Sequence, residues 1–212
     1  GFRSSPIISV HEALGADFLI WNQMLVPKSY CKGVESEHKT IRNAAGLTDM
    51  SGIKKIWLKG EGALKVIDFL ITRDCNKVKP GSAAYTALLD ENGNLVDDAI
   101  VFHLSPRESD KFDATWLICF GAGFGVDYLT KSLQDSKVVA RADDNTVCLM
   151  LQGPYAETVM KRVVKGGLTK NLGRFEHGLF SILDSDVMIA RTSYSGEDGF
   201  EIFAESQDAV HI

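Results

Sequence analysis

Short apolar runs separated by turn residues are the feature that most restricts how this sequence can fold. Residues 116–120 and 147–151 are among the longest of these runs, and each has the length of a buried strand. A membrane-spanning helix needs about 20 apolar residues, so the sequence predicts no membrane partner. The pattern indicates a folded chain that is built from many short elements.

Length and charge narrow the class of protein. The 212 residues suffice for one or two domains of about 100–200 residues each. The 23 basic and 28 acidic side chains give a formal net charge of −5, whereas a protein that grips nucleic acid normally presents a basic surface. We therefore expect no nucleic acid among its partners.

The cysteines and histidines lack the spacing of a metal site. The sequence contains no C-x-x-C pair and no H-x-x-x-H pair, so we expect neither a metal nor a thioredoxin-like redox motif. Cys119 and Cys148 lie within apolar runs, where a free cysteine packs as a small hydrophobic side chain. Reduced thiols in a cytoplasmic compartment are favoured over disulfides.

Periodicity and turn residues predict an α+β chain. Helices are expected at residues 35–43, 62–71, 126–133 and 155–164, and strands at 53–59, 85–89, 95–104, 115–120, 138–142, 147–151, 178–183, 187–191 and 199–203. The Asn92-Gly93 pair predicts a hairpin turn between two of these strands. The order favours mostly antiparallel sheets covered by helices on one side. For the second helix we expect an apolar face made mainly of Leu64, Ile67, Phe69, Leu70 and Ile71.

The same order predicts two domains. Residues 51–138 read as a self-contained unit, and residues 1–50 and 139–212 as the two parts of a discontinuous first domain. Residues 206–212 are typical of the first turn of a helix, and the chain begins without methionine. We therefore expect this sequence to be a piece of a longer protein.

Two adjacent aspartates, Asp97 and Asp98, interrupt an apolar strand. Aspartate is a poor strand residue, and alternation sends neighbouring side chains to opposite faces of a sheet. One carboxylate would then lie in solvent and the other in the interior, where a carboxylate must be paired, hydrogen-bonded or functional. The alternative is a bulge or an edge strand with both groups in water. Tyr85 is expected near Asp98 across the hairpin, or else as a simple packing residue.

Two loops are further candidates. Glu201 lies between Phe200 and Ile202, so alternation places it on the opposite face, where a fixed carboxylate can accept two parallel N–H groups from a planar ligand. An ordinary polar hairpin with Glu201 in water is the alternative. The glycine-rich segment 121–125 would suit either a phosphate or a close backbone turn.

These pieces together resemble the folate-binding family of the glycine cleavage T protein, aminomethyltransferase. The similarity runs through Glu37-His38 and residues 45–51, 60–70, 79–81, 95–98, 151–154, 190–192 and 194–202. It implies the N-terminal part of a three-domain fold around a channel for tetrahydrofolate. On this resemblance a third, β-rich domain would lie beyond Ile212, so we expect the 212-residue piece to be inactive.

The resemblance also implies roles for four residues. Asp98 matches the family's essential carboxylate, and Tyr85 matches a tyrosine that lines the folate channel. Tyr194 and Glu201 match the pair around the pterin, with Glu201 accepting its N–H groups. A carboxylate stabilises the positive charge that develops during one-carbon transfer or moves a proton as a general base. The family needs no metal.

The implied function is tetrahydrofolate-dependent one-carbon transfer of the aminomethyltransferase type. The donor would be a small amine or a lipoyl-bound intermediate, with a lipoyl carrier protein as partner. Ser51 is followed by Gly52-Ile53 where T proteins usually show Ser-His-Met, and Phe120-Gly121-Ala122 replaces a Val-Asn-Ala-like segment. Two alternatives therefore stay open: a folate-dependent demethylase of a small methylated amine, betaine or sulfonium compound, and a folate-binding regulatory module without turnover.

Overall fold

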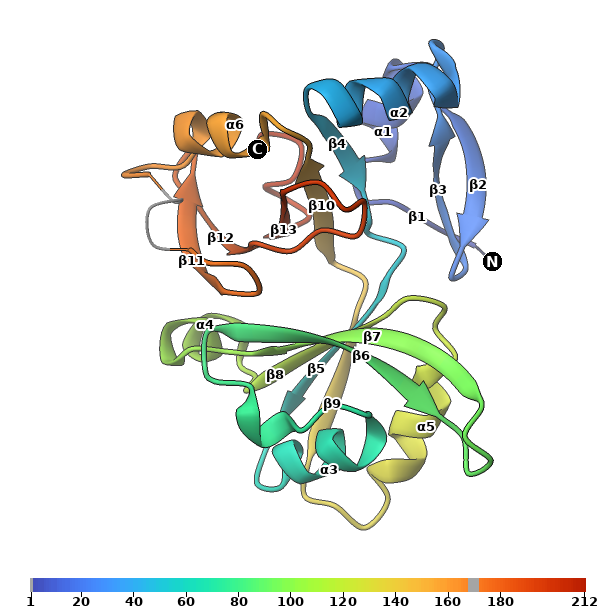
Figure 1. Ribbon diagram of the computed structural model, residues 1–212, viewed down its shortest axis with the longest axis vertical. Helices are drawn as coiled ribbons and strands as arrows, with labels where there is room; N and C mark the ends of the chain where they lie inside the picture. Colours follow the sequence, from blue (N-terminus) through green and yellow to red (C-terminus); the bar gives the residue numbers. More distant parts are fainter. Residues whose placement is uncertain (1, 168–171) are drawn as a thin grey trace. The chain divides into compact units, whose positions relative to one another are not determined.

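A computed structural model describes residues 2–167 and 172–212. The chain divides into two compact units (Figure 1). Unit 1 comprises residues 1–52 and 145–212, and unit 2 comprises residues 53–144. The two ends of the chain therefore belong to one unit, and the middle of the chain forms the other.

Unit 1 contains two sheets. One has the strand order β1-β3-β2 and the other the order β11-β12-β13-β10-β4. Among the described residues every strand pairing in them is antiparallel except β1 with β3. The elements are β1 (Arg3–Ser4), α1 (Ile8–Ala13), β2 (Asp17–Trp21), β3 (Met24–Ser29), α2 (Gly33–Asn43), β4 (Gly46–Asp49), β10 (Thr146–Gln152), α6 (Ala156–Val163), β11 (His177–Ile182), β12 (Ser185–Ala190) and β13 (Gly199–Glu205).

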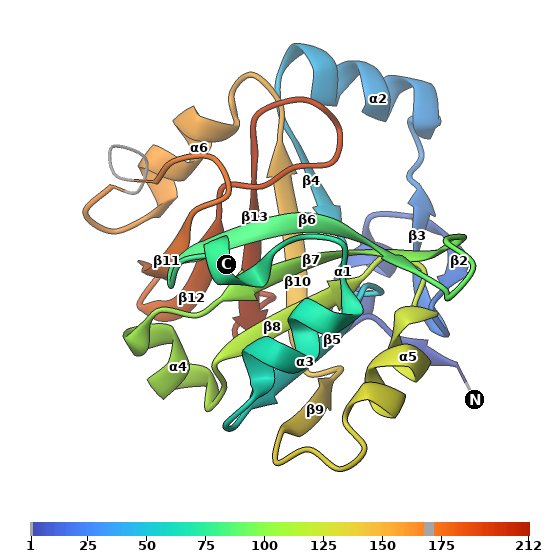
Figure 2. The ribbon, with the colours of Figure 1, turned by 60° about the horizontal axis from the view of Figure 1, so that its bottom comes forward.

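Unit 2 is a five-stranded antiparallel sheet of order β6-β7-β8-β5-β9. Figures 1 and 2 show α3 and α5 on the same side of this sheet. Ile67 of α3 and Leu129 of α5 are buried there with Val101 and Ile118 of the sheet. The elements are β5 (Lys54–Lys59), α3 (Ala63–Leu70), the short 3₁₀ helix η1 (Cys75–Lys77), β6 (Ser82–Leu89), β7 (Leu95–His103), α4 (Pro106–Phe112), β8 (Trp116–Phe120), α5 (Gly125–Ser132) and β9 (Val139–Asp143).

The predicted α+β class with mostly antiparallel sheets is confirmed, and each predicted helix and strand is present within a few residues. The compact units divide at residues 144/145, six residues after the expected boundary at 138/139. Strand β9 pairs with β5, with Ala140 opposite Leu58 and Ala142 opposite Ile56, so residues 139–144 belong to unit 2. At the other boundary, residues 51–52 belong to unit 1.

Two local predictions also need correction, whereas the predicted hairpin turn between β6 and β7 is confirmed. Phe69 is 84% exposed, because the buried positions of α3 are Ala63, Ile67 and Leu70, whose spacing of three and four residues defines a different helix face. In the hairpin turn only Gly93 has positive φ, at 82°, while Asp90 accepts hydrogen bonds from the turn's backbone. The C-terminal segment forms turns rather than the start of a helix.

Candidate functional site

Tyr85 and Asp98 form a hydrogen-bonded pair on adjacent strands of unit 2. In the register of β6 and β7, Ala87 lies opposite Asp98 and Tyr85 lies opposite Ile100, so the two side chains are diagonal neighbours. The Tyr85 hydroxyl donates to Asp98 Oδ2 at 2.7 Å. This hydrogen bond, with smaller contributions from burial and the negative charge of Asp98, raises the pKa of Tyr85. The predicted proximity of the two residues is confirmed.

Asp97 points the other way and is only 3% exposed. Its Oδ1 accepts the backbone N–H groups of Asp98 at 2.8 Å and Ala122 at 2.9 Å, and its Oδ2 accepts that of Gly125 at 2.9 Å. Strand β7 lies between β6 and β8, so it is not an edge strand, although its register with β6 shifts just before Asp97. The interpretation with both carboxylates in water is therefore wrong.

The backbone of the glycine-rich loop 121–125 already donates hydrogen bonds to the carboxylate of Asp97. Two of its backbone N–H groups, from Ala122 and Gly125, donate to the carboxylate of Asp97. Gly123 has φ of 84°, which fits the close backbone turn that was the alternative. The phosphate-binding interpretation is wrong, because Asp97 occupies the donors that a phosphate would need.

Glu201 is buried in the second sheet of unit 1, with 4% exposure. It lies on β13 between β12 and β10, opposite Ala190 on one side and Met150 on the other. Its neighbours Phe200 and Ile202 belong to the hydrophobic core of the unit, and alternation places Glu201 on the opposite face. The interpretation with Glu201 in water is wrong.

The partners of Glu201 are neutral. Thr192 Oγ1 donates a hydrogen bond to Oε2, and Cys148 Sγ lies 3.8 Å from Oε1. Burial raises the pKa of Glu201, and these two hydrogen bonds only partly oppose the effect. No cation pairs with Glu201 within residues 2–167 and 172–212. The carboxyl group is thus held in the interior with few donors.

Tyr194 lies in the loop before β13 and is 64% exposed. Arg191 braces this loop by donating to both oxygens of Asp198, at 3.1 and 2.7 Å. Among the described residues no hydrogen bond joins Tyr194 to Glu201. Unit 1 therefore carries an exposed aromatic ring on a braced loop and a buried carboxyl group on the strand that follows it.

A polar cluster around Asp49 in unit 1 was not found from the sequence. Asp49 accepts hydrogen bonds from Ser5 Oγ, from the Ser51 backbone at 2.9 Å and from His11, whose Nε2 lies at 2.7 Å. The Tyr30 hydroxyl lies 2.8 Å from His11 Nδ1. Burial alone would raise the pKa of Asp49, but these hydrogen bonds outweigh it and the pKa is lowered. Only the Asp-x-Ser spacing of Asp49 and Ser51 is a local signal; the other members are distant in sequence.

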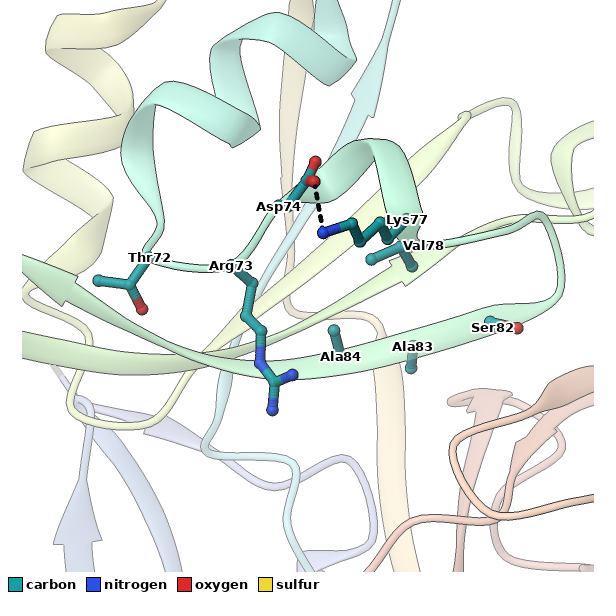
Figure 3. A pocket seen from close by; sticks show the side chains of 8 residues that line it. All are labelled: Thr72, Arg73, Asp74, Lys77, Val78, Ser82, Ala83 and Ala84. Carbon is teal, nitrogen blue, oxygen red and sulfur yellow. Dashed lines mark ion pairs between the residues drawn. The ribbon is translucent and has the colours of Figure 1, made fainter.

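Unit 2 also has a pocket of about 390 Å³ (Figure 3). It contains none of the four predicted site residues. Asp74 and Lys77 form an ion pair in it at 3.2 Å, and Arg73 extends away from that pair and donates through Nε to the backbone oxygen of Tyr85. The charged groups of the pocket are thus engaged within the protein. Its lining consists of Thr72, Arg73, Asp74, Lys77, Val78, Ser82, Ala83 and Ala84.

Neither a metal site nor a membrane span is found in the described ranges. No group of three or more His, Cys, Asp or Glu side chains there is arranged to hold a metal ion. No helix among those residues is both long enough and apolar enough to cross a bilayer.

The fold defines a class: an α+β chain with two mostly antiparallel units, one of which is assembled from both ends of the sequence. The family model of the GCVT N-terminal domain matches residues 7–212. The chain belongs to this family, and the resemblance to the glycine cleavage T protein is confirmed.

Two curated relatives carry different names. The gamma subunit of a heme-dependent oxidative N-demethylase from Ectopseudomonas mendocina (strain ymp) is 37% identical over 211 residues, which cover 100% of this chain and 54% of that protein. The aminomethyltransferase of Bacillus pumilus (strain SAFR-032) is 31% identical over 214 residues, which cover 99% of this chain and 56% of the relative. The chain spans about half the length of these relatives.

Solved structures agree with the family. The crystal structure of the glycine cleavage system aminomethyltransferase T from Bartonella henselae matches with a TM-score of 0.83 at 28% identity, covering 100% of this chain and 56% of that one. A heterotetrameric sarcosine oxidase from Corynebacterium sp. U-96 matches with a TM-score of 0.55 at 14% identity, covering 84% of this chain and 85% of that one, which is a likeness of fold alone. The predicted fold class, the N-terminal part of the T-protein fold, is confirmed.

Proposed function

We propose that the full-length protein catalyses tetrahydrofolate-dependent one-carbon transfer. The observation that carries the proposal is Asp98, a half-buried carboxylate whose Oδ2 is held by Tyr85 at 2.7 Å. Within the described residues its Oδ1 accepts no hydrogen bond. A fixed carboxylate with one oxygen that accepts no hydrogen bond can stabilise positive charge or take a proton without first reorganising.

Glu201 supports the folate part of the proposal. A pterin presents an amino group and a ring N–H side by side, and a carboxylate can accept both in parallel. Glu201 fits this donor set, because it is buried with only a hydroxyl and a thiol as partners. The exposed ring of Tyr194 offers an aromatic surface for the same ligand. Tetrahydrofolate, when bound, would supply the nitrogen atoms that carry the one-carbon unit.

The two carboxylates have separate roles in this proposal. Glu201 would bind and orient the pterin by accepting its N–H groups, whereas Asp98 would stabilise charge and hold or release a proton at Oδ1. Tyr85 would orient Asp98 and also contact the folate. The donor would be a small amine or a lipoyl-bound intermediate, delivered in the second case by a lipoyl carrier protein.

A second candidate function is demethylation of a small methylated amine. It is favoured by the 37% identity to the gamma subunit of an oxidative N-demethylase, compared with 31% to an aminomethyltransferase. Betaine and sulfonium donors belong to the same candidate, because a carboxylate such as Asp98 suits any cationic methyl donor. The residues assigned to folate would be the same in both functions.

Substitutions at the two carboxylates test the proposal in the full-length protein. We expect Asp98→Asn to reduce kcat by about 100-fold or more while the Kd for tetrahydrofolate stays within about twofold of the wild-type value. Glu201→Gln should instead weaken folate binding, because the amide replaces one acceptor by a donor. Asp110→Asn, at an exposed position of α4, is the matched control and should change neither value.

The donor is tested with the same proteins. Turnover of an N-methylated amine with folate as acceptor would favour the demethylase, and turnover of an aminomethylated lipoyl protein would favour the aminomethyltransferase. Folate binding without turnover of either would identify a regulatory module instead. The proposal is wrong if Asp98→Asn keeps full activity and Glu201→Gln keeps full folate affinity.

A further inference from the structure

The backbone of Gly121 lies directly against the carboxylate of Asp98. A Cβ atom built on Gly121 would lie 2.3 Å from Asp98 Oδ1, which is well inside van der Waals contact. Gly121 is not among the glycines with positive φ, so its backbone conformation is open to any residue. A side chain at residue 121 would therefore displace the carboxylate of Asp98.

Asp97 fixes the loop that carries Gly121. Its carboxylate accepts N–H groups from Ala122 and Gly125 of the loop and also from Asp98, all between 2.8 and 2.9 Å. The Gly121 N–H donates to the Asp98 backbone oxygen at 3.0 Å, which continues the β7–β8 pairing past Phe120 opposite Ala99. The loop is thus tied to β7 on both sides of Asp98.

Tyr85 holds Asp98 from the other side. Its hydroxyl binds Oδ2 at 2.7 Å, whereas Oδ1 lies beside Gly121. The carboxylate is therefore confined between a hydroxyl on one oxygen and loop backbone at the other. A shift of Oδ1 away from the loop would rotate the whole group and displace Oδ2 from Tyr85, because the carboxylate is planar.

We infer that Gly121 and Asp97 are positioning residues for Asp98: Asp97 fixes loop 121–125, and the missing side chain of Gly121 leaves the space that Oδ1 of Asp98 occupies. The role toward substrate rests on the proposed function, whereas the position of Asp98 rests on the contacts alone. A side chain at residue 121 would then move the carboxylate that the proposed function assigns to the reacting group.

The ionisation of Tyr85 reports the position of Asp98 without any assay of activity. Protein labelled with ¹³C at tyrosine Cζ is titrated by NMR, and the Tyr85 signal is identified by its loss in Tyr85→Phe. Because the hydrogen bond to Asp98 is the largest cause of the raised Tyr85 pKa, Asp98→Asn should lower that pKa toward the ordinary value of about 10. This variant calibrates the loss of the contact.

Gly121→Ala is the decisive variant in this titration. We expect it to lower the Tyr85 pKa in the same direction as Asp98→Asn, since the new methyl group displaces Oδ1. Phe124→Ala, in the same loop and with a 66% exposed side chain, is the control and should leave the Tyr85 pKa unchanged. If the Tyr85 pKa of Gly121→Ala equals that of the wild-type protein, the inference is overturned.

Asp97→Asn tests the positioning role. It replaces one acceptor by a donor that faces backbone N–H groups, so we expect faster hydrogen exchange at Ala122 and Gly125 and a lower Tyr85 pKa. Unchanged exchange and an unchanged Tyr85 pKa would refute the role of Asp97. If this variant does not fold, Ala122→Pro removes one of the donors to Asp97 instead and is read by the same Tyr85 titration.

Activity of the full-length protein tests the role toward substrate. We expect Gly121→Ala to lower kcat by about 100-fold, the cost of misplacing a reacting group by about 1 Å, with the folate Kd unchanged. Full activity of Gly121→Ala would overturn that role. If the wild-type protein shows no folate-dependent turnover, the proposed function fails, but the Tyr85 titration still decides whether Gly121 and Asp97 position Asp98.

Discussion

Replacement of Glu201 by glutamine should change how the stability of the protein depends on pH. Glu201 is buried on β13 with only Thr192 and Cys148 as hydrogen-bonding partners, and burial raises its pKa in the folded state. An unfolded glutamate titrates near its ordinary pKa of about 4.3. Between these two pKa values the folded protein keeps a proton that the unfolded chain has released.

The sign and size of the effect follow from that proton. Because the folded state binds one proton more, the free energy of unfolding falls with rising pH by about 1.4 kcal/mol per pH unit. The stability contributed by neutral Glu201 is complete below the unfolded pKa and is lost as the pH rises through the folded pKa. The amide introduced by Glu201→Gln does not titrate, and its carbonyl can still accept from Thr192, so at pH 4 we expect the variant and the wild type to agree within about 1 kcal/mol.

Urea denaturation from pH 4 to pH 8 measures this difference. We expect the variant to gain on the wild-type protein by about 1.4 kcal/mol per pH unit above pH 4.3, until the folded pKa is reached and the gain levels off. Glu91→Gln, in the exposed hairpin turn, is the control and should follow the wild type. Thr192→Val, which removes a hydrogen bond that lowers the Glu201 pKa, should extend the sloping range to higher pH. A constant difference between Glu201→Gln and wild type across the range would refute the reasoning.

Two further predictions concern other parts of the molecule. Asp49→Asn should lower the free energy of unfolding at pH 7 by about 1.5–3 kcal/mol, the usual contribution of hydrogen bonds to a charged group. Because the Asp49 pKa is lowered in the folded state, this deficit should shrink as the pH falls below about 4. Urea titrations that show a pH-independent deficit would contradict the assignment. The thiols should also differ in reactivity, because Cys31 is exposed whereas Cys75 is buried with its pKa raised to about 12. A disulfide reagent at pH 8 should label Cys31 rapidly and Cys75 only after denaturation. Fast labelling of Cys31→Ser, detected by mass spectrometry, would be evidence against this.

Strong local signals made the middle of the chain predictable. The segments of β5 to β8 are rich in apolar residues and bounded by turn residues, and the hairpin between β6 and β7 carries Asn92-Gly93. The N-terminal hairpin lacked such a signal. Its turn is made by Asn22 and Gln23, both with positive φ at 49° and 65°, and a Gln at such a position does not mark a turn in the way that glycine does.

The position of the domain boundary depended on pairing rather than composition. Residues of β9 are mostly exposed, so the strand has no apolar alternation to show which core it joins. Its place in unit 2 comes from backbone hydrogen bonding with β5, a contact between segments about 80 residues apart in the chain. Sequence patterns of a few residues carry no information about such a partner.

The candidate site shows a similar limit. Alternation predicts that Asp97 and Asp98 face opposite sides of β7, but it does not say which one enters the core, because Ile100 and Phe102 on one side are as apolar as Ala99 and Val101 on the other. The core of helices α3 and α5 includes Ala99 and Val101, so Asp97 is the one that shares their side. The loop that supplies its N–H donors follows the next strand, and only the folded sheet brings it there.

Three buried acids of this protein differ in the number of hydrogen-bond donors that they receive. Asp97 receives three backbone N–H groups, and Asp49 receives donors from the Ser5 hydroxyl and from both the hydroxyl and the backbone of Ser51, together with a contact to His11. Glu201 receives one hydroxyl and a weak thiol donor. A buried carboxylate with few donors is costly to ionise, and two N–H groups from a planar ligand would supply what the fold does not. The shortage of donors at Glu201 is therefore the physical reason to expect a ligand there, and the N–H groups of that ligand should lower the pKa of Glu201.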